Sequence, residues 1–261
     1  MGLRATAGDA RRVLISPFDG TARLRPPLLV HASHHKAGTV WFENVLQAVS
    51  RNYHLHFREI SREPIPPGTG VAFYTHASAA HWESIATRPS RVSHMVRDPR
   101  DMVVSAYFYH RRSNEEWLHW PRPELGGLTY QEHLLALPQK EGLAEEIRRC
   151  ARDQVPDLMG WPYGRPGVLE LRYEDAMADE EAVFRRLFAH YGFRTDAIEQ
   201  SVATALSFSL SRGGGGSSHA RSGRPGEWRT VFDDDHVALF KELMGQTVLE
   251  LGYEASPAWS R

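Results

Sequence analysis

Lys36, Gly38 and Thr39 form a short turn whose residue types and spacing suit the binding of phosphate. The turn follows the apolar run 28–30 and precedes apolar residues at a helical spacing, namely Val40, Trp41, Val45, Leu46 and Val49. A helix that begins in a glycine-containing turn offers unpaired backbone N–H groups and the positive end of its dipole to an anion. The sequence therefore predicts a strand, a P-loop-like anion-binding turn and a helix. The alternative is an ordinary turn with a solvated lysine.

The order of residues in this turn is not that of a Walker A loop. A Walker A loop places its lysine directly after a glycine. Here Lys36 precedes Gly38. The pattern disfavours ATPases and kinases and indicates another class of phosphate-binding protein.

A histidine that could act as a base follows a predicted strand at 71–75. Ligands of open α/β sheets bind outside the carboxyl ends of the strands, so His76 lies where chemistry usually occurs. The alternative is a strand-end histidine that only bonds to a loop.

Arg97 follows another predicted strand, at 92–96, and a helix is expected directly after it. Asp98 is a favourable N-cap and Pro99 suits the first helical position. An arginine in this place can bind a phosphate through two hydrogen bonds. The alternative is a salt bridge to Asp98 or Asp101.

Composition narrows the classes of function. The 261 residues carry 31 Lys and Arg against 32 Asp and Glu, a net charge of −1, which argues against a general nucleic-acid binder. The single cysteine, Cys150, excludes an intramolecular disulfide and a cysteine-rich zinc site. His31, His34 and His35 have no Cys or carboxylate partners nearby in sequence, so we expect no metal. We find no signal peptide or membrane span, and expect a cytoplasmic protein.

Alternation of strands and helices predicts the fold class. Further strands are expected at 53–57 and 168–172, and helices at 142–155, 179–191, 198–207 and 236–251. The prediction is a single α/β domain with a mostly parallel sheet and helices on both faces, over 28–255. Residues 1–27 are expected to be a loose lead-in, 111–138 a surface excursion, and Gly213–Ser218 a flexible loop.

Three segments together resemble the sulfotransferase family, whose sulfuryl donor is 3′-phosphoadenosine 5′-phosphosulfate (PAPS). They are the Lys-x-Gly-Thr loop, the stretch from Arg97 to Ser105, and the Arg-x-Gly-x-x-Gly-x-Trp segment that ends at Trp228. The resemblance runs from about Leu28 to Tyr253. It implies transfer of a sulfuryl group from PAPS to a hydroxyl of a small-molecule or sugar acceptor, without metal, nucleic acid or membrane.

The resemblance also implies roles for individual residues. Lys36 and His76 are the catalytic pair, with His76 as general base and Lys36 stabilising the leaving phosphate. A larger set of residues would bind the donor. Lys36, Ala37, Gly38, Thr39, Val40 and Trp41 form the loop for the 5′-phosphosulfate, and Trp41 would also pack near the adenine, as would Tyr173, Ser207 and Phe208. The residues at the 3′-phosphate would be Arg97, Ser105, Arg221, Ser222 and Gly223. Gly213–Ser218 is expected to close over the donor.

The sequence also departs from the family pattern. His35 replaces a common proline, Ala37 and Val40 replace hydroxyl residues, and Tyr74 stands where many members have a second lysine. The usual dimerisation stretch is not recognisable in 229–236, so the oligomeric state stays open. Two alternatives also remain: another nucleotide-dependent transferase or kinase, and a non-catalytic nucleotide-binding protein.

Overall fold

The structure, a computed structural model, describes residues 16–210 and 223–261. These residues form two compact units, each built from two stretches of chain. The first unit comprises 16–96 and 161–210, and the second comprises 97–160 and 223–261. The predicted loop Gly213–Ser218 lies outside the described residues.

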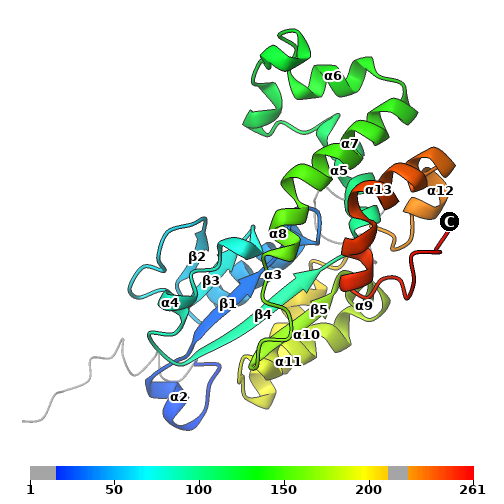
Figure 1. The fold of residues 1–261 in the computed structure, drawn as a ribbon. Coiled ribbons are helices and arrows are strands. Elements are labelled where there is room, and N and C mark those ends of the chain that lie inside the picture. The colour runs from blue at the N-terminus through cyan, green and yellow to red at the C-terminus, as the bar shows by residue number, and fades with distance from the viewer. Residues whose placement is uncertain (1–15, 211–222) are drawn as a thin grey trace, which may run out of the picture. The chain divides into compact units, whose positions relative to one another are not determined.

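The first unit contains a five-stranded parallel sheet with the strand order β2-β3-β1-β4-β5 (Figure 1). The strands are β1 Leu28–Ala32, β2 Phe57–Ile60, β3 Val71–Tyr74, β4 Ser90–Val96 and β5 Val168–Arg172. Strand β1 is central and pairs with β3 and β4. Because all strands are parallel, their carboxyl ends meet at one edge of the sheet. This confirms the predicted α/β class.

Helices cover both faces of this sheet. The helices of the unit are α2 Gly20–Leu24, α3 Thr39–Asn52, η1 Ala77–Ala79, α4 Trp82–Ile85, α9 Tyr173–Ala178, α10 Glu180–His190 and α11 Thr195–Leu206. Leu29, Phe73 and Met95 pack with α3, α10 and α11 into one apolar cluster. Val30 and Ala72 point to the opposite face, into a cluster with η1 and α4.

Two segments of the first unit differ from the prediction. Part of the expected lead-in is structured, since α2 forms and Phe18 is buried against the ring of Phe193. The predicted strand at 53–57 is wrong except at its last residue. Helix α3 runs to Asn52, and His54 turns the chain with a left-handed φ of 52°. The strand therefore begins only at Phe57.

The second unit is built mainly from helices. They are α5 Pro99–His110, η2 Glu116–His119, η3 Pro123–Leu125, α6 Tyr130–Ala136, α7 Gln139–Asp153, α8 Val155–Met159, α12 Trp228–Val231 and α13 Asp234–Glu250. The predicted start of α5 is confirmed, because the Asp98 side chain accepts from Arg100 N at 2.9 Å with Pro99 at the first position. Apolar side chains of α5, α7 and α13 share one core.

The segment 111–138 is more than a surface excursion. Helix α6 begins in a capping box in which Thr129 accepts from Glu132 N at 3.2 Å and the Glu132 carboxylate accepts from Thr129 N at 2.8 Å. Leu118, Tyr130 and Leu134 are buried in the core of the second unit. In the described ranges, no helix has both the length and the apolar composition needed to cross a membrane.

Candidate active site

The loop between β1 and α3 makes a sharp turn at the carboxyl end of the central strand. Lys36 and Gly38 both adopt left-handed backbone conformations, with φ of 66° and 84°. A side chain at Gly38 would place its Cβ only 3.1 Å from the Tyr173 ring, so this position requires glycine. The first-turn amides of α3 have no carbonyl one turn earlier in the helix to bond. The loop therefore has the form of an anion-binding turn.

Two short hydrogen bonds tie the loop together at the carbonyl of His34. The Thr39 hydroxyl donates to this oxygen at 2.7 Å, and Ala37 N donates to it at 3.0 Å. The hydroxyls of Ser33 and Thr39 are 3.2 Å apart. The Thr39 hydroxyl, expected to bind phosphate, thus holds the loop closed in this structure.

Aromatic side chains gather behind the loop. Trp41 is buried, with its ring 6.4 Å from that of Tyr173 and 5.4 Å from that of Phe184. Its indole N–H is buried and meets no acceptor among the described residues. Phe208 packs at the margin of the same apolar cluster. The structure therefore brings Trp41, Tyr173 and the loop together.

The other predicted adenine-side residue, Ser207, is placed differently. It caps the C-terminus of α11, and its hydroxyl donates to the carbonyl of Thr204 at 2.7 Å. The Thr204 hydroxyl accepts from Asn52 at 3.2 Å, in the last turn of α3. The loop lies at the other end of α3, and no contact of Ser207 with the loop is seen among the described residues. Its predicted role stays a prediction.

His76 follows β3 at the same edge of the sheet. Tyr74, the last residue of β3, pairs with Ala32, and its carbonyl accepts from Ser33 N at 2.9 Å. His76 lies two residues further and is exposed. Tyr74 itself is fully buried, which raises the pKa of its hydroxyl, and this group accepts from His81 N at 3.3 Å. Tyr74 is therefore a structural residue.

In the second unit, Asp101 joins helix α5 to the C-terminal segment. Its carboxylate accepts from Gly226 N at 2.6 Å and from Trp228 N at 2.9 Å. Burial raises the pKa of Asp101 to about 6, against the opposing charge of nearby Arg97. Ser105 lies one turn further on the same side of α5. Arg97, which is predicted to bind the 3′-phosphate, thus lies near a buried carboxylate that the sequence offered only as its alternative ion-pair partner.

The remaining predicted residues at this end divide into two groups. Gly223 lies three residues before Gly226, at the start of the described C-terminal segment, with a left-handed φ of 63°. Arg221 and Ser222 lie outside the described residues.

The buried guanidinium of Arg100 anchors Trp228. It lies 4.0 Å from the centre of the Trp228 ring and 4.7 Å from that of Trp259. Ion pairs to Asp98 at 2.7 Å and Glu254 at 2.5 Å compensate its charge. Trp228, the last residue of the Arg-x-Gly-x-x-Gly-x-Trp segment, is thus held in place by a buried and charge-compensated guanidinium.

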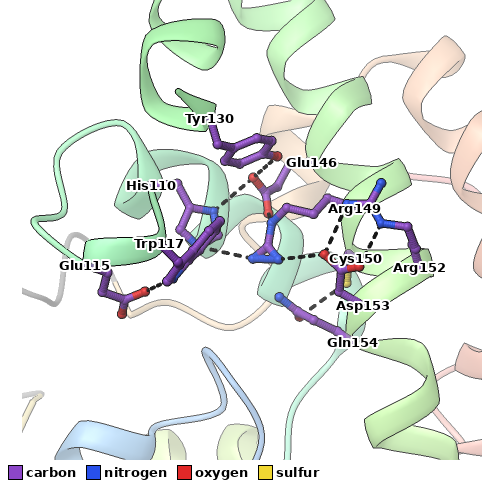
Figure 2. Close-up of polar contacts among 10 residues, drawn as sticks. All are labelled: His110, Glu115, Trp117, Tyr130, Glu146, Arg149, Cys150, Arg152, Asp153 and Gln154. Atoms are coloured by element: carbon purple, nitrogen blue, oxygen red, sulfur yellow. Dashed lines mark hydrogen bonds and ion pairs between the residues drawn. The ribbon is translucent and has the colours of Figure 1, made fainter. Parts of the chain in front are cut away.

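A second polar cluster of this unit surrounds the fully buried carboxylate of Glu146 (Figure 2). His110 and Tyr130 each contact its Oε2 at 3.0 Å, and Arg149 donates to its Oε1 at 2.9 Å. Burial opposes ionisation of Glu146, but the charges and hydrogen bonds of His110 and Arg149 outweigh it and lower the pKa. The cluster links α5, α6 and α7. It is a fully bonded structural network.

A third polar group, also missed from the sequence, lies behind the loop in the first unit. His34 Nε2 and His94 Nε2 are 2.8 Å apart, and His94 Nδ1 is 2.5 Å from Glu170 Oε2. His94 on β4 and Glu170 on β5 are direct register partners. The available signal was Glu170, a charged residue between Leu169 and Leu171 of β5, together with His94 on the neighbouring strand. Among the described side chains, no group of three or more His, Cys, Asp or Glu is arranged to bind a metal ion.

Comparison with solved structures supports the fold. Retinol dehydratase in complex with androsterone and the inactive cofactor PAP matches with a TM-score of 0.52 at 15% identity, over 91% of this chain and 85% of that one. A mouse sulfotransferase, SULT7A1, complexed with PAP matches with a TM-score of 0.46 at 18% identity, over 95% and 92% of the two chains. No protein-family model matches the sequence, and no curated protein matches it either. The chain therefore has the PAPS-dependent sulfotransferase fold that its motifs predict.

Proposed function

We propose that this protein transfers a sulfuryl group from PAPS to a hydroxyl of a small-molecule acceptor. The observation that carries the proposal is the turn at the end of β1, where Lys36 and Gly38 take left-handed conformations directly before α3. Such a turn suits a 5′-phosphosulfate, because it combines helix-start amides with a mobile positive charge. The fold supports the same reading.

Two features around the turn fit a bound nucleotide. The indole N–H of Trp41 is a buried donor that meets no acceptor in the described part of the chain. Gly38 has no side chain, so the space beside the Tyr173 ring that a Cβ would fill stays open. We assign residues 37–40 to the phosphosulfate, and Trp41, Tyr173 and Phe208 to the adenine side. Arg97, Ser105 and Gly223 are assigned to the 3′-phosphate. Arg221, Ser222 and Ser207 keep their assignments by resemblance.

The proposed chemistry is an in-line displacement at sulfur. The acceptor oxygen forms a bond to sulfur while the bond from sulfur to the bridging phosphate oxygen breaks, and its electron pair stays on that oxygen. Lys36 stabilises the negative charge that develops there. His76 takes the proton of the acceptor hydroxyl, and its exposure at the strand edge suits this task.

The proposed acceptor class follows from a structure with the same fold. Retinol dehydratase shares the fold and has been crystallised with androsterone, a small apolar alcohol, beside PAP. We therefore propose a small-molecule hydroxyl as the first acceptor class to test, with sugar hydroxyls second.

The proposal is tested by sulfuryl transfer from PAPS to a panel of alcohols, phenols and sugars. We expect turnover with at least one class, and His76→Ala should lower it by about 100- to 10,000-fold, because a general base contributes that much. The affinity for adenosine 3′,5′-bisphosphate should stay unchanged in this variant. His56→Ala, at an exposed histidine of the same unit, serves as the matched control.

Two outcomes would contradict the proposal. Wild-type turnover in His76→Ala would remove the general-base role. Binding of the bisphosphate without turnover on any acceptor would favour a non-catalytic nucleotide-binding protein.

A further inference from the structure

We propose that Glu170, His94 and His34 form a hydrogen-bonded chain that positions the phosphate-binding loop, and that the two imidazoles share a single proton between them. The inference deepens the proposed function, because it rests on this loop binding the donor nucleotide. The three residues are positioning residues and touch no reacting atom.

The carboxylate end of the chain fixes the orientation of His94. Nδ1 of His94 lies 2.5 Å from Glu170 Oε2, and the other carboxylate oxygen accepts from the Trp161 indole at 2.9 Å. The His94 ring also stacks on the Trp161 indole, with centroids 4.3 Å apart and an interplanar angle of 18°. A hydrogen bond in the ring plane and a stack against its face leave His94 little freedom to rotate.

The contact between the imidazoles defines where a proton can lie. Two ring nitrogens 2.8 Å apart form a hydrogen bond only when one carries a hydrogen and the other does not. His94 Nδ1 donates to the carboxylate, so His94 Nε2 can accept from His34, or His94 can carry both hydrogens and donate to His34. Both rings are buried, so two facing N–H groups would repel without relief from water. Protonation of both rings must therefore separate them.

The chain reaches the loop through the backbone of His34. The carbonyl of this residue accepts from the Thr39 hydroxyl at 2.7 Å and from Ala37 N at 3.0 Å. Lys36, in its left-handed conformation, directly precedes Ala37, the first of these two donors. A fixed His34 ring therefore fixes the peptide to which both loop hydrogen bonds attach. Separation of the imidazoles would release this anchor.

Three other titratable groups lie near His34 and His94, namely His31, Tyr163 and Glu170. His31 lies on β1 in the opposite core, where burial and the charge of His94 lower its pKa to about 3, so it stays neutral. Tyr163 meets the His94 ring edge-on at 5.5 Å. Burial raises the pKa of the Glu170 carboxyl, which is consistent with its need for a partner. Glu170 is thus the carboxylate that contacts the pair directly, through Nδ1 of His94.

Three substitutions separate the links of the chain. In His94→Asn the amide nitrogen takes the place of Nδ1, so the bond to Glu170 survives and the bond to His34 is lost. In His34→Gln the amide takes the place of Nε2, so the bond to His94 survives but an imidazole is replaced by a group that stays neutral. His56→Asn changes an exposed histidine of the same unit and serves as the control.

Calorimetry with adenosine 3′,5′-bisphosphate at about pH 8 and about pH 6 tests the proposal. At the higher pH we expect His94→Asn to bind about 5- to 30-fold more weakly than wild type, which corresponds to the loss of one buried hydrogen bond. His34→Gln and His56→Asn should bind like wild type. At the lower pH wild type and His56→Asn should lose more affinity than His34→Gln. Protonation of the ligand's own phosphates affects all variants equally, so it cancels when the variants are compared at the same pH.

Hydrogen exchange of the loop amides gives a readout that needs no nucleotide. We expect the Ala37 amide to exchange faster in His94→Asn than in wild type, while His34→Gln keeps its protection. Wild-type affinity and exchange in His94→Asn would overturn the proposal, as would identical pH dependence in wild type and His34→Gln. Failure of wild type to bind the nucleotide would count against the proposed function alone, since the exchange data would still decide on the chain.

Discussion

At the scale of single residues, Asp101 links the pH to the stability of the second unit. Burial raises its pKa from 3.8 to about 6 although it accepts two backbone N–H bonds. Between about pH 4 and pH 6 the Asp101 carboxyl is therefore protonated in the folded protein but ionised in the unfolded chain. The resulting stability is present below the unfolded pKa and is lost as the pH rises through the folded pKa. The shift of about 2 pH units corresponds to about 3 kcal/mol.

Asp101→Asn should abolish this pH dependence. The asparagine oxygen can still accept one of the two N–H bonds while its amide group faces the other, as the hydroxyl of a protonated carboxyl does. We therefore expect the variant to match wild type at about pH 4 and to be about 3 kcal/mol more stable than wild type at about pH 7. Urea unfolding of wild type and variant at about pH 4, pH 5 and pH 7 provides the measurement. The difference between the two unfolding free energies should change by about 3 kcal/mol across this range. Parallel curves would show that Asp101 does not titrate as described.

At this scale, the sequence could predict contacts between residues close together in the chain, but not those between residues far apart. The Asp98 cap and the glycine at position 38 were predictable, because a cap and a tight turn are decided by residues only a few positions apart. The contact of His34 with His94 spans 60 residues, and that of His94 with Glu170 spans 76. Such contacts depend on strand register, which a single sequence leaves undetermined.

At the scale of elements, Gly142 permits the close packing of α7 against α5. A Cβ at this position would lie 2.7 Å from Cε2 of the buried Tyr107 ring. Gly142→Ala should therefore lower the free energy of unfolding by about 1 to 3 kcal/mol, as overpacking does in other cores. Gly245→Ala on α13 is the matched control, because its nearest neighbour lies at 3.7 Å.

We expect this control to stabilise the protein by about 0.5 to 1 kcal/mol, since alanine is the better helix former. Chemical denaturation of both variants provides the measurement. Equal effects of the two substitutions would contradict the packing account.

The elements themselves were predicted where a short apolar run or a clear cap marks them. Strands β1, β3, β4 and β5 fall within two residues of their predicted bounds. Strands β1 and β3 are buried throughout, and β4 and β5 keep apolar residues on the face that packs in the core. The prediction at 53–57 was wrong because its aromatic residues were read as strand, whereas Tyr53 caps the end of α3. In 111–138 the capping box at Thr129 was a readable signal for α6 that the polar composition concealed.

At the scale of the whole molecule, the alternation of strands and helices predicted the α/β class, but not the division into two compact units. Each unit is built from two separate stretches of chain; the second unit, for example, combines 97–160 with the C-terminal stretch. The amino-acid composition carries no signal for this division. Lys36, Trp41 and Tyr173 belong to the first unit, whereas Arg97 and Ser105 belong to the second.

The most direct test of the account is the binding of adenosine 3′,5′-bisphosphate, compared by calorimetry with that of 5′-AMP and ATP. We predict that the bisphosphate binds at least about 10-fold more tightly than either, because a charge-assisted arginine contact to the 3′-phosphate contributes more than 1 kcal/mol. Arg97→Ala should abolish this preference, and Arg112→Ala, at an exposed arginine of the same unit, should not. A preference for ATP, or equal affinity for all three nucleotides, would contradict the assignment of a PAPS site.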